Sequence, residues 1–156
     1  MEKHFELTDE TIEVAGNTLH RIRCTRDCKW AKTGDLGGFI EKEDNLSGDA
    51  WVAGNAWVSG TARVSGNAWV YDNAQVAGNA RIDCIKAHCG FDVFGSCGRH
   101  THAYITAENK IEITCGCFRG SIEEFEAKVR KTHGDNQYAH EYLAIIYLIK
   151  IKFGLV

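Results

Sequence analysis

Residues 46–81 read LSGDAW, VAGNAW, VSGTAR, VSGNAW, VYDNAQ and VAGNAR, and this six-residue repeat decides the fold. Each unit opens with an aliphatic residue and has alanine in its fifth position, and Ile82 opens a seventh unit. A period of six matches neither the helical period of about 3.6 residues nor a long strand alternation. It matches a three-sided coil with six residues per side, because the alanine and the aliphatic residue two positions later both point inward from a short strand. We therefore predict a short left-handed parallel β-helix.

The corners of this coil are expected at the Gly-Asn-like pairs between the strands, such as Gly54-Asn55 and Gly66-Asn67. Glycine and asparagine tolerate corner dihedrals that β-branched residues resist. Unrelated hairpins with Asn-Gly turns are the competing interpretation. They do not explain why the pattern recurs over six units without a slip.

Side chains that point outward from the coil should stack every 18 residues, since three six-residue sides make one turn. Trp51 then lies over Trp69, Trp57 over Gln75, and Arg63 over Arg81. Tryptophan and arginine are common in binding hot spots. We therefore assign the candidate partner-binding residues as follows: Trp51, Trp57, Trp69, Arg63 and Arg81. In the alternative interpretation, the terminal segments or a second subunit cover the tryptophans, and the arginines extend into water.

Six hexads make only two coils, and so short a stack needs capped ends. We expect residues 1–39 to form an N-terminal β cap, 40–83 the hexapeptide-repeat β-helix, and 84–156 a Cys/His-rich α+β unit. Ser121 and Glu124 form a capping box that predicts a helix ending at Gly134, and a second helix is expected over residues 139–153. The predicted fold is mainly β with C-terminal helices.

Composition narrows the classes of function. The 156 residues carry a net charge of −3, whereas nucleic-acid-binding domains usually have a strong basic excess. No apolar run approaches the roughly 20 residues of a membrane span, and no apolar segment follows Met1. We expect a cytoplasmic protein that binds neither nucleic acid directly nor a membrane. The sequence leaves open whether the chain forms a homo-oligomer.

Cysteines and histidines gather near the C-terminal side of the repeat. In Cys115-Gly116-Cys117 both thiolates are expected on one face of a strand, where they would share a zinc ion, which prefers four sulfur or nitrogen ligands. The candidate metal ligands are Cys97, His100, His102, Cys115, Cys117, Cys84 and Cys89. The alternative is buried thiols that pack as small apolar residues. A Cys–His nucleophile is disfavoured because no third orienting group is evident.

The chain resembles two groups of proteins. Its hexads resemble the bacterial hexapeptide-repeat superfamily, which includes trimeric acyltransferases. Segments 18–23 (TLHRIR), 32–41 (KTGDLGGFIE), 44–47 (DNLS), 115–118 (CGCF) and 132–136 (THGDN) resemble small proteins of phages and prophages. Members of that group usually carry Gly-Ser-Arg and a Thr-rich run before C-G-C-F. Here Gly95-Ser96 precedes Cys97, Arg99 comes two residues later, and His102 replaces a threonine, which favours a metal site over an anion site.

A phage origin implies, by analogy, action on a host machine. The first hypothesis is a non-enzymatic inhibitor of a host defence system that acts by stoichiometric protein binding, such as an anti-CRISPR that occupies a Cas nuclease. The alternative is a sponge that sequesters a nucleotide immune signal, with Gly95, Ser96, Arg99 and the C-G-C-F segment forming a phosphate pocket. An acyltransferase is disfavoured, because two coils leave too little groove for coenzyme A.

Overall fold

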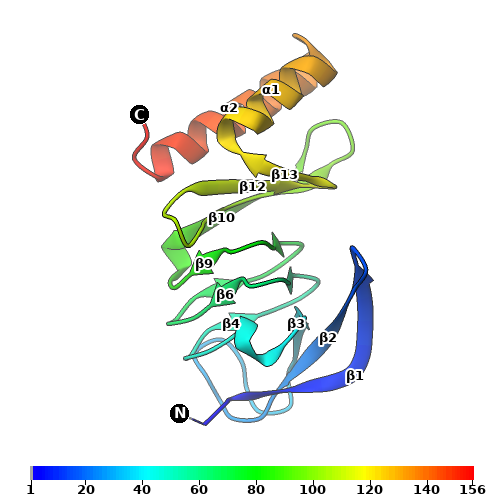
Figure 1. Cartoon of the computed structure of the whole chain (residues 1–156), viewed down its shortest axis with the longest axis vertical. Coiled ribbons are helices and arrows are strands. Elements are labelled where there is room, and N and C mark those ends of the chain that lie inside the picture. The colour runs from blue at the N-terminus through cyan, green and yellow to red at the C-terminus, as the bar shows by residue number, and fades with distance from the viewer. Residues whose placement is uncertain (1) are drawn as a thin grey trace.

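The computed structural model describes residues 2–156 as an elongated molecule whose parts follow chain order along its length (Figure 1). A hairpin lies at the N-terminal end, the hexads stack in the middle, and a sheet covered by two helices forms the other end. The prediction of a mainly β chain with C-terminal helices is confirmed.

The N-terminal elements are β1 (Phe5–Val14), β2 (Asn17–Cys24), β3 (Leu36–Ile40) and the short 3-10 helix η1 (Glu43–Asn45). The repeat holds β4 (Trp51–Val52), β5 (Trp57–Val58), β6 (Arg63–Val64), β7 (Trp69–Val70), β8 (Gln75–Val76) and β9 (Arg81–Ile82). The C-terminal elements are η2 (Ile85–Ala87), β10 (His88–Phe94), β11 (Arg99–Ile105), β12 (Ile111–Cys115), β13 (Phe118–Ser121), α1 (Ile122–His133) and α2 (Gln137–Lys152).

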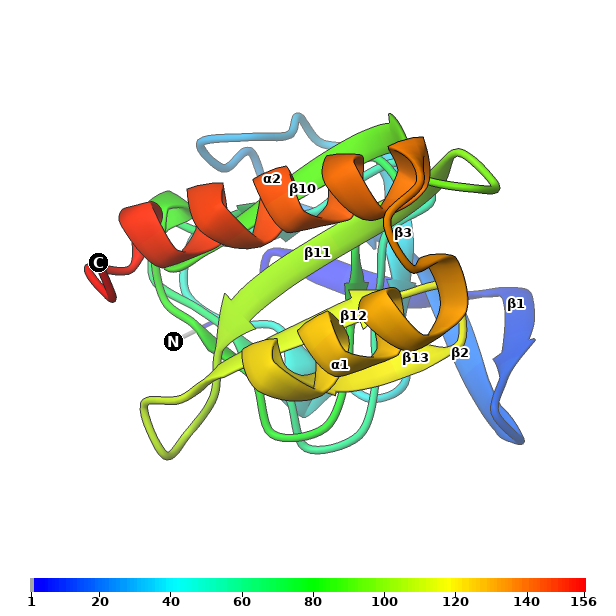
Figure 2. The same cartoon turned by 90° about the horizontal axis from the view of Figure 1, so that it is seen from above.

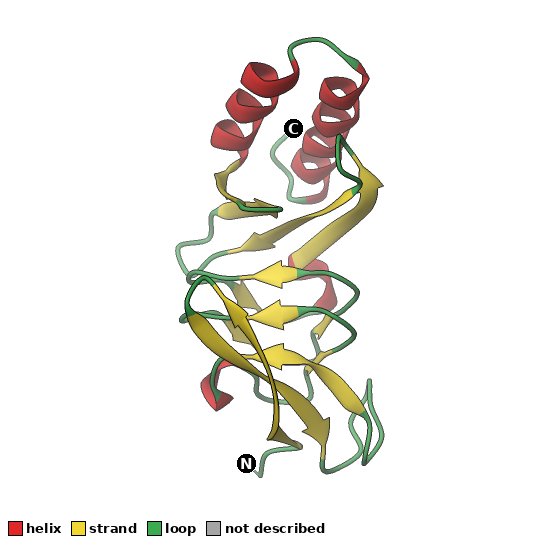
Figure 3. Cartoon of the chain, turned by 90° about the vertical axis from the view of Figure 1, so that its right-hand side faces the viewer, coloured by secondary structure: helices red, strands yellow, loops and turns green. Residues whose placement is uncertain are grey.

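The two-residue strands of the repeat pair in parallel with the predicted register (Figure 3). Trp51 is opposite Trp69 in the β4–β7 pair, and Trp57 is opposite Gln75 in the β5–β8 pair. Arg63 is opposite Arg81 in the β6–β9 pair. The aliphatic first positions and the alanines of the hexads are at most 2% exposed, so they form one interior as predicted. Burial of these apolar side chains is the main force that holds the stack together.

The corners of the repeat depend on backbone conformations with positive φ. Gly66 has φ 61°, and a Cβ atom built there would lie only 2.2 Å from the Asp83 carbonyl oxygen of the next layer. The corner formed by residue 72 has aspartate, whose φ of 57° is tolerated because Asp and Asn adopt this region more readily than most residues. The close approach of successive layers therefore accounts for the glycine at position 66.

The N-terminal unit joins the repeat through a continuous sheet with strand order β1-β2-β3-β5-β8. β3 pairs antiparallel with β2 and parallel with β5, where Phe39 is opposite Trp57. The predicted boundary at residues 39/40 therefore falls inside β3. The β1–β2 hairpin runs along one side of the coil, and its tip stands beside the stack (Figure 1).

The C-terminal unit is a four-stranded antiparallel sheet, in the order β10-β11-β12-β13, with α1 and α2 on its outer face (Figure 2). α2 lies over β10 and β11, and α1 lies over β12 and β13. The predicted capping box is confirmed, because Ser121 accepts from the Glu124 N–H while Glu124 reaches back to the Ser121 N–H. α2 begins two residues before the predicted start, since the Asn136 side chain caps it by accepting from the Ala139 N–H.

The inner and outer faces of this sheet have separate partners. The inner face packs on the coil through Tyr104, whereas Ala103 and Ile113 on the outer face belong to a second core with the helices. The four predicted apolar residues of α2 are buried in that second core: Tyr142, Ile145, Ile146 and Ile149. Among the described helices, none has both the length and the apolar character to span a membrane.

Candidate ligand-binding site

A pocket of about 230 Å³ opens between the C-terminal sheet and its two helices. Segments that are far apart in the sequence line it: the β10–β11 turn, the β12–β13 turn and the sheet-facing side of α1. We call it the basic pocket and define it by six of its lining residues: Ser96, Arg99, Cys117, Phe118, Lys128 and His133. It unites the Ser96–Arg99 and C-G-C-F segments, which the alternative hypothesis of a nucleotide sponge placed in one phosphate pocket.

Two glycines allow the walls of the basic pocket to approach each other. A Cβ at Gly95, where φ is 83°, would lie 2.0 Å from the Tyr142 hydroxyl of α2, and the Gly95 N–H donates to Glu141 Oε1 over 2.9 Å. A Cβ at Gly116 would lie 2.7 Å from Arg99 Nη1. The β10–β11 turn is therefore fastened to α2, while the Arg99 side chain lies across the β12–β13 turn.

The basic pocket carries unbalanced positive charge. Arg99 starts β11 and Lys128 lies on α1, and none of the ion pairs within residues 2–156 includes either of them. His133 adds an imidazole, and Ser96 and Thr132 add hydroxyl groups. Such a set donates hydrogen bonds from charged groups, which an oxyanion accepts better than a neutral ligand does.

The floor of the basic pocket is aromatic and rigid. The Tyr142 ring packs edge-on against Phe125, with centroids 5.6 Å apart, and stacks on His133 at 5.7 Å. Burial raises the pKa of Tyr142, the neighbouring Cys115 adds to the rise, and Arg99 acts in the opposite direction. The hydroxyl therefore stays protonated near neutral pH and is available as a hydrogen-bond donor.

The predicted metal ligands do not converge. β12 ends at Cys115, and Gly116 turns the chain with φ 60°, so the prediction that Cys115 and Cys117 share one face of a strand is wrong. Cys115 is buried toward the helices, where Thr101 Oγ1 donates to its sulfur over 3.3 Å. Thr101 is the register partner of Cys115. Neighbouring residues of a strand point to opposite faces, so His100 and His102 project from the other side of β11.

The remaining cysteines are also apart. Cys97 and Cys117 are exposed in separate turns, Cys84 packs against the core of the coil, and Cys89 packs against the helix core. Within residues 2–156, no three His, Cys, Asp or Glu side chains are placed so that they could hold one metal ion. Zinc binding stays a prediction for which this fold assembles no ligand set.

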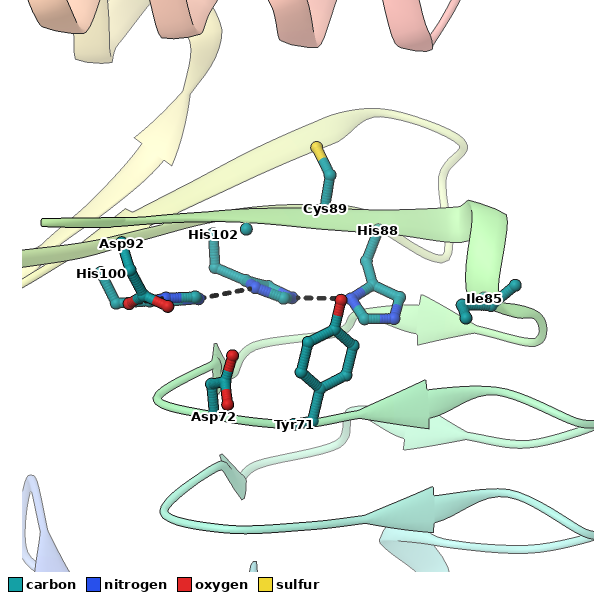
Figure 4. A pocket seen from close by; sticks show the side chains of 9 residues that line it. Tyr71, Asp72, Ile85, His88, Cys89, Asp92, His100 and His102 are labelled. Atoms are coloured by element: carbon teal, nitrogen blue, oxygen red, sulfur yellow. Dashed lines mark hydrogen bonds and ion pairs between the residues drawn. The ribbon is translucent and has the colours of Figure 1, made fainter. Parts of the chain in front are cut away.

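His88, His100 and His102 instead form a hydrogen-bonded row between the sheet and the coil (Figure 4). Asp92 Oδ1 lies 2.7 Å from His100 Nδ1, and His100 Nε2 lies 3.2 Å from His102 Nδ1. His102 Nε2 lies 3.1 Å from His88 Nδ1, and His88 Nε2 lies 2.9 Å from the carbonyl oxygen of Trp69. The row thus links the rim of the C-terminal sheet to a strand of the repeat.

Burial decides which rings of this histidine row are neutral. It lowers the pKa of His88 from 6.5 to about 4, and it lowers that of the fully enclosed His102 well below 6.5. Both ends of the row are acceptors, a carboxylate and a carbonyl, so four links need four protons, while three neutral imidazoles supply only three.

The tryptophan edge predicted for partner binding is largely covered within the chain. Trp51 is 2% exposed beneath the N-terminal unit, where His4 Nε2 lies 2.8 Å from the Ala50 carbonyl oxygen, so its assignment to a partner surface is wrong. Trp69 stacks on Trp30 with centroids 5.0 Å apart, as the alternative interpretation expected. Trp57 remains half-buried in a groove beside the coil.

The predicted arginine edge remains accessible. Arg63 is exposed, and its neighbour Arg81 is half-buried and donates from Nη1 to the carbonyl oxygens of Thr61 and Ala80, each over 2.9 Å. Both arginines line one hollow with Lys42 and Asp44.

Sequence reasoning missed the helical side of the basic pocket and the histidine row. Lys128 and Thr132 are one helical turn apart on α1, and the sequence does not show which side of this helix packs on the sheet. The sequence could have indicated the histidine row, because His100 and His102 are two residues apart on a strand and so share a face. No protein-family model matches the chain, and a search of curated proteins finds no significant match. Function is therefore inferred from the geometry.

Proposed function

We propose that this protein binds a small anionic ligand bearing phosphate in the basic pocket and withholds it from other proteins without converting it. One observation carries the proposal: Arg99 of β11 and Lys128 and His133 of α1 line a single cavity, and no carboxylate pairs with Arg99 or Lys128 in the described chain. Like charges held together in this way repel each other unless an anion lies between them. In a phage or prophage, a ligand of this kind would be a nucleotide signal of host immunity.

The repeat serves this function as a scaffold. We propose that it is a left-handed parallel β-helix, supported by the parallel pairing of residues 18 apart and by the buried aliphatic and alanine positions. Its end supports the inner face of the sheet, while the outer face and the helices hold the pocket. A rigid support keeps the cationic groups in place before the ligand arrives, which lowers the entropy lost on binding.

Thermal denaturation with a panel of inorganic phosphate, mononucleotides and cyclic dinucleotides tests the proposal. A ligand whose free concentration is about 100 times its Kd stabilises the folded chain by about 2.7 kcal/mol. This raises Tm by about 5–10 °C for a protein of this size. Arg99→Ala should abolish the rise, because Arg99 supplies a charged donor of the pocket. Arg63→Ala, which removes an exposed arginine at the coil, should leave it intact.

Two results would refute this proposal: no phosphate-bearing compound shifts Tm, or Arg99→Ala and Arg63→Ala weaken binding equally. Chromatography of the ligand after release from denatured protein distinguishes sequestration from catalysis. The proposal requires that the ligand is recovered unchanged.

A protein partner is the second candidate, favoured by the arginine edge. Arg63 and Arg81 lie side by side on parallel strands, with Lys42 near them, and suit an acidic surface such as one on a Cas effector. Affinity capture with purified effector complexes tests this candidate. It requires that a complex is retained by the natural protein and lost with Arg63→Glu.

A further inference from the structure

A second and larger cavity adjoins the basic pocket. This groove has a volume of about 670 Å³, and Cys117 and Phe118 of the β12–β13 turn line both cavities. Its other walls are the tip of the β1–β2 hairpin, including Asn17, and the coil face that carries Trp57 and Gln75. We call it the Trp57 groove. The two cavities therefore meet at one turn, with positive charge on one side and an indole on the other.

The Trp57 groove has the composition of a site for a planar heterocycle. Trp57 is half-buried there, whereas Trp51 is 2% exposed and the Trp69 ring is stacked on Trp30. Asn17 and Gln75 contribute side-chain amides, which can donate to and accept from the edge of a nucleobase. Stacking on an aromatic side chain tolerates every base, because each base has a π-face.

The floor of this groove is held in place by contacts between the coil and the C-terminal unit. Thr114 Oγ1 of β12 donates to the Gln75 carbonyl oxygen over 2.9 Å. Arg119, at the rim, lies 3.3 Å from Glu112 and is thereby neutralised. Positive charge that lacks a carboxylate partner is thus found on the basic-pocket side of the shared turn, and this separates a compartment for phosphate from one for a base.

We propose that the ligand is a nucleotide that spans both cavities, with its phosphate in the basic pocket and its base against Trp57 in the groove. This inference rests on the proposed function, because it takes the basic pocket as the phosphate site. A ribose joins the two parts across Cys117 and Phe118. Ligand-binding cavities commonly have volumes of about 300–1,000 Å³, and the groove lies in that range whereas the basic pocket alone does not.

Isothermal titration calorimetry with three probes tests the inference: inorganic phosphate, adenosine and AMP. AMP should bind at least about tenfold more tightly than phosphate, since base stacking adds to the phosphate contacts. Trp57→Ala should weaken AMP and adenosine by about tenfold or more and leave phosphate unchanged. Arg99→Ala should weaken AMP and phosphate and leave adenosine unchanged. Trp57→Phe should restore most of the AMP affinity, because it keeps a ring for stacking.

Controls separate the two proposals. Tyr147→Ala, which removes a 58% exposed aromatic ring on α2, should change no affinity. If AMP binds no better than phosphate and Trp57→Ala has no effect, the inference fails while the proposed function stands. If phosphate, AMP and every other phosphate-bearing compound of the panel fail to bind, the proposed function fails as well. Should Trp57→Ala not fold, NMR contacts between adenine protons and the Trp57 indole in the natural protein decide the matter, and their absence overturns the inference.

Discussion

Lowering the pH from 6.5 to 4.5 is expected to destabilise the protein by about 2–3 kcal/mol through His88 alone, with His102 adding to the loss. Burial lowers the pKa of His88 in the folded chain to about 4, whereas the unfolded chain titrates near 6.5. Between these values the unfolded chain takes up a proton that the folded chain does not. Acid therefore favours unfolding, and the stability that neutral His88 contributes above pH 6.5 is lost as the pH falls.

Denaturant unfolding at several pH values measures this effect. His88→Gln keeps an amide N–H to donate to the Trp69 carbonyl, but it does not titrate, so the dependence between pH 6.5 and 4.5 should flatten. His140→Gln is the matched control, because His140 is 64% exposed and pairs with Asp135 at the surface. An acid dependence equally steep in His88→Gln and in the natural protein would show that His88 does not link pH to stability.

The expected site of this acid effect is the junction between the coil and the C-terminal sheet. The row ends on a backbone carbonyl of β7, so a charge on His88 would lie between two packed layers. Charging a buried group without a compensating partner is unfavourable. In hydrogen exchange at acid pH, the amides of β10 and β11 should therefore exchange before those of the inner coil.

The stack was predictable from the sequence because each hexad repeats one local rule. Val52 and Val70 need the same interior, so their separation along the chain sets the pairing of every strand in the repeat. The burial of Trp51 was not predictable in this way. Its cover comes from residues near the N-terminus, such as His4, and no local pattern shows which outward face a distant segment will occupy.

The candidate site was also predictable from the sequence only in part. The alternative hypothesis placed the Ser96–Arg99 and C-G-C-F segments in one pocket, and the fold brings them together. The zinc cluster was predicted on the assumption that Cys115 and Cys117 lie on one strand and so point to the same face. A turn at Gly116 takes Cys117 out of the strand. The strand register places His102 on the opposite face of the sheet from Cys115. Lys128 and His133 were missed, because the docking of α1 on the sheet decides which side of the helix lines a cavity.

Gly95→Ala is expected to destabilise the protein by about 3 kcal/mol and to abolish ligand binding in the basic pocket. Gly95 has φ 83°, which alanine adopts only with strain, and the added Cβ would overlap the Tyr142 hydroxyl at 2.0 Å. The ring cannot yield freely, since Phe125 and His133 pack against it. The β10–β11 turn must therefore move away from α2, and Ser96 and Arg99 move with it.

Gly98→Ala in the same turn separates backbone strain from this collision. Gly98 also has positive φ, at 55°, but the nearest atom to an added Cβ is a Val93 methyl carbon at 3.3 Å. It should cost about 1–2 kcal/mol and keep ligand affinity within about twofold. Denaturant unfolding gives the stability difference, and calorimetry with phosphate gives the affinities. Equal losses in the two variants would mean that the fastening of the turn to Tyr142 does not shape the pocket, because strain common to both glycines would then explain everything.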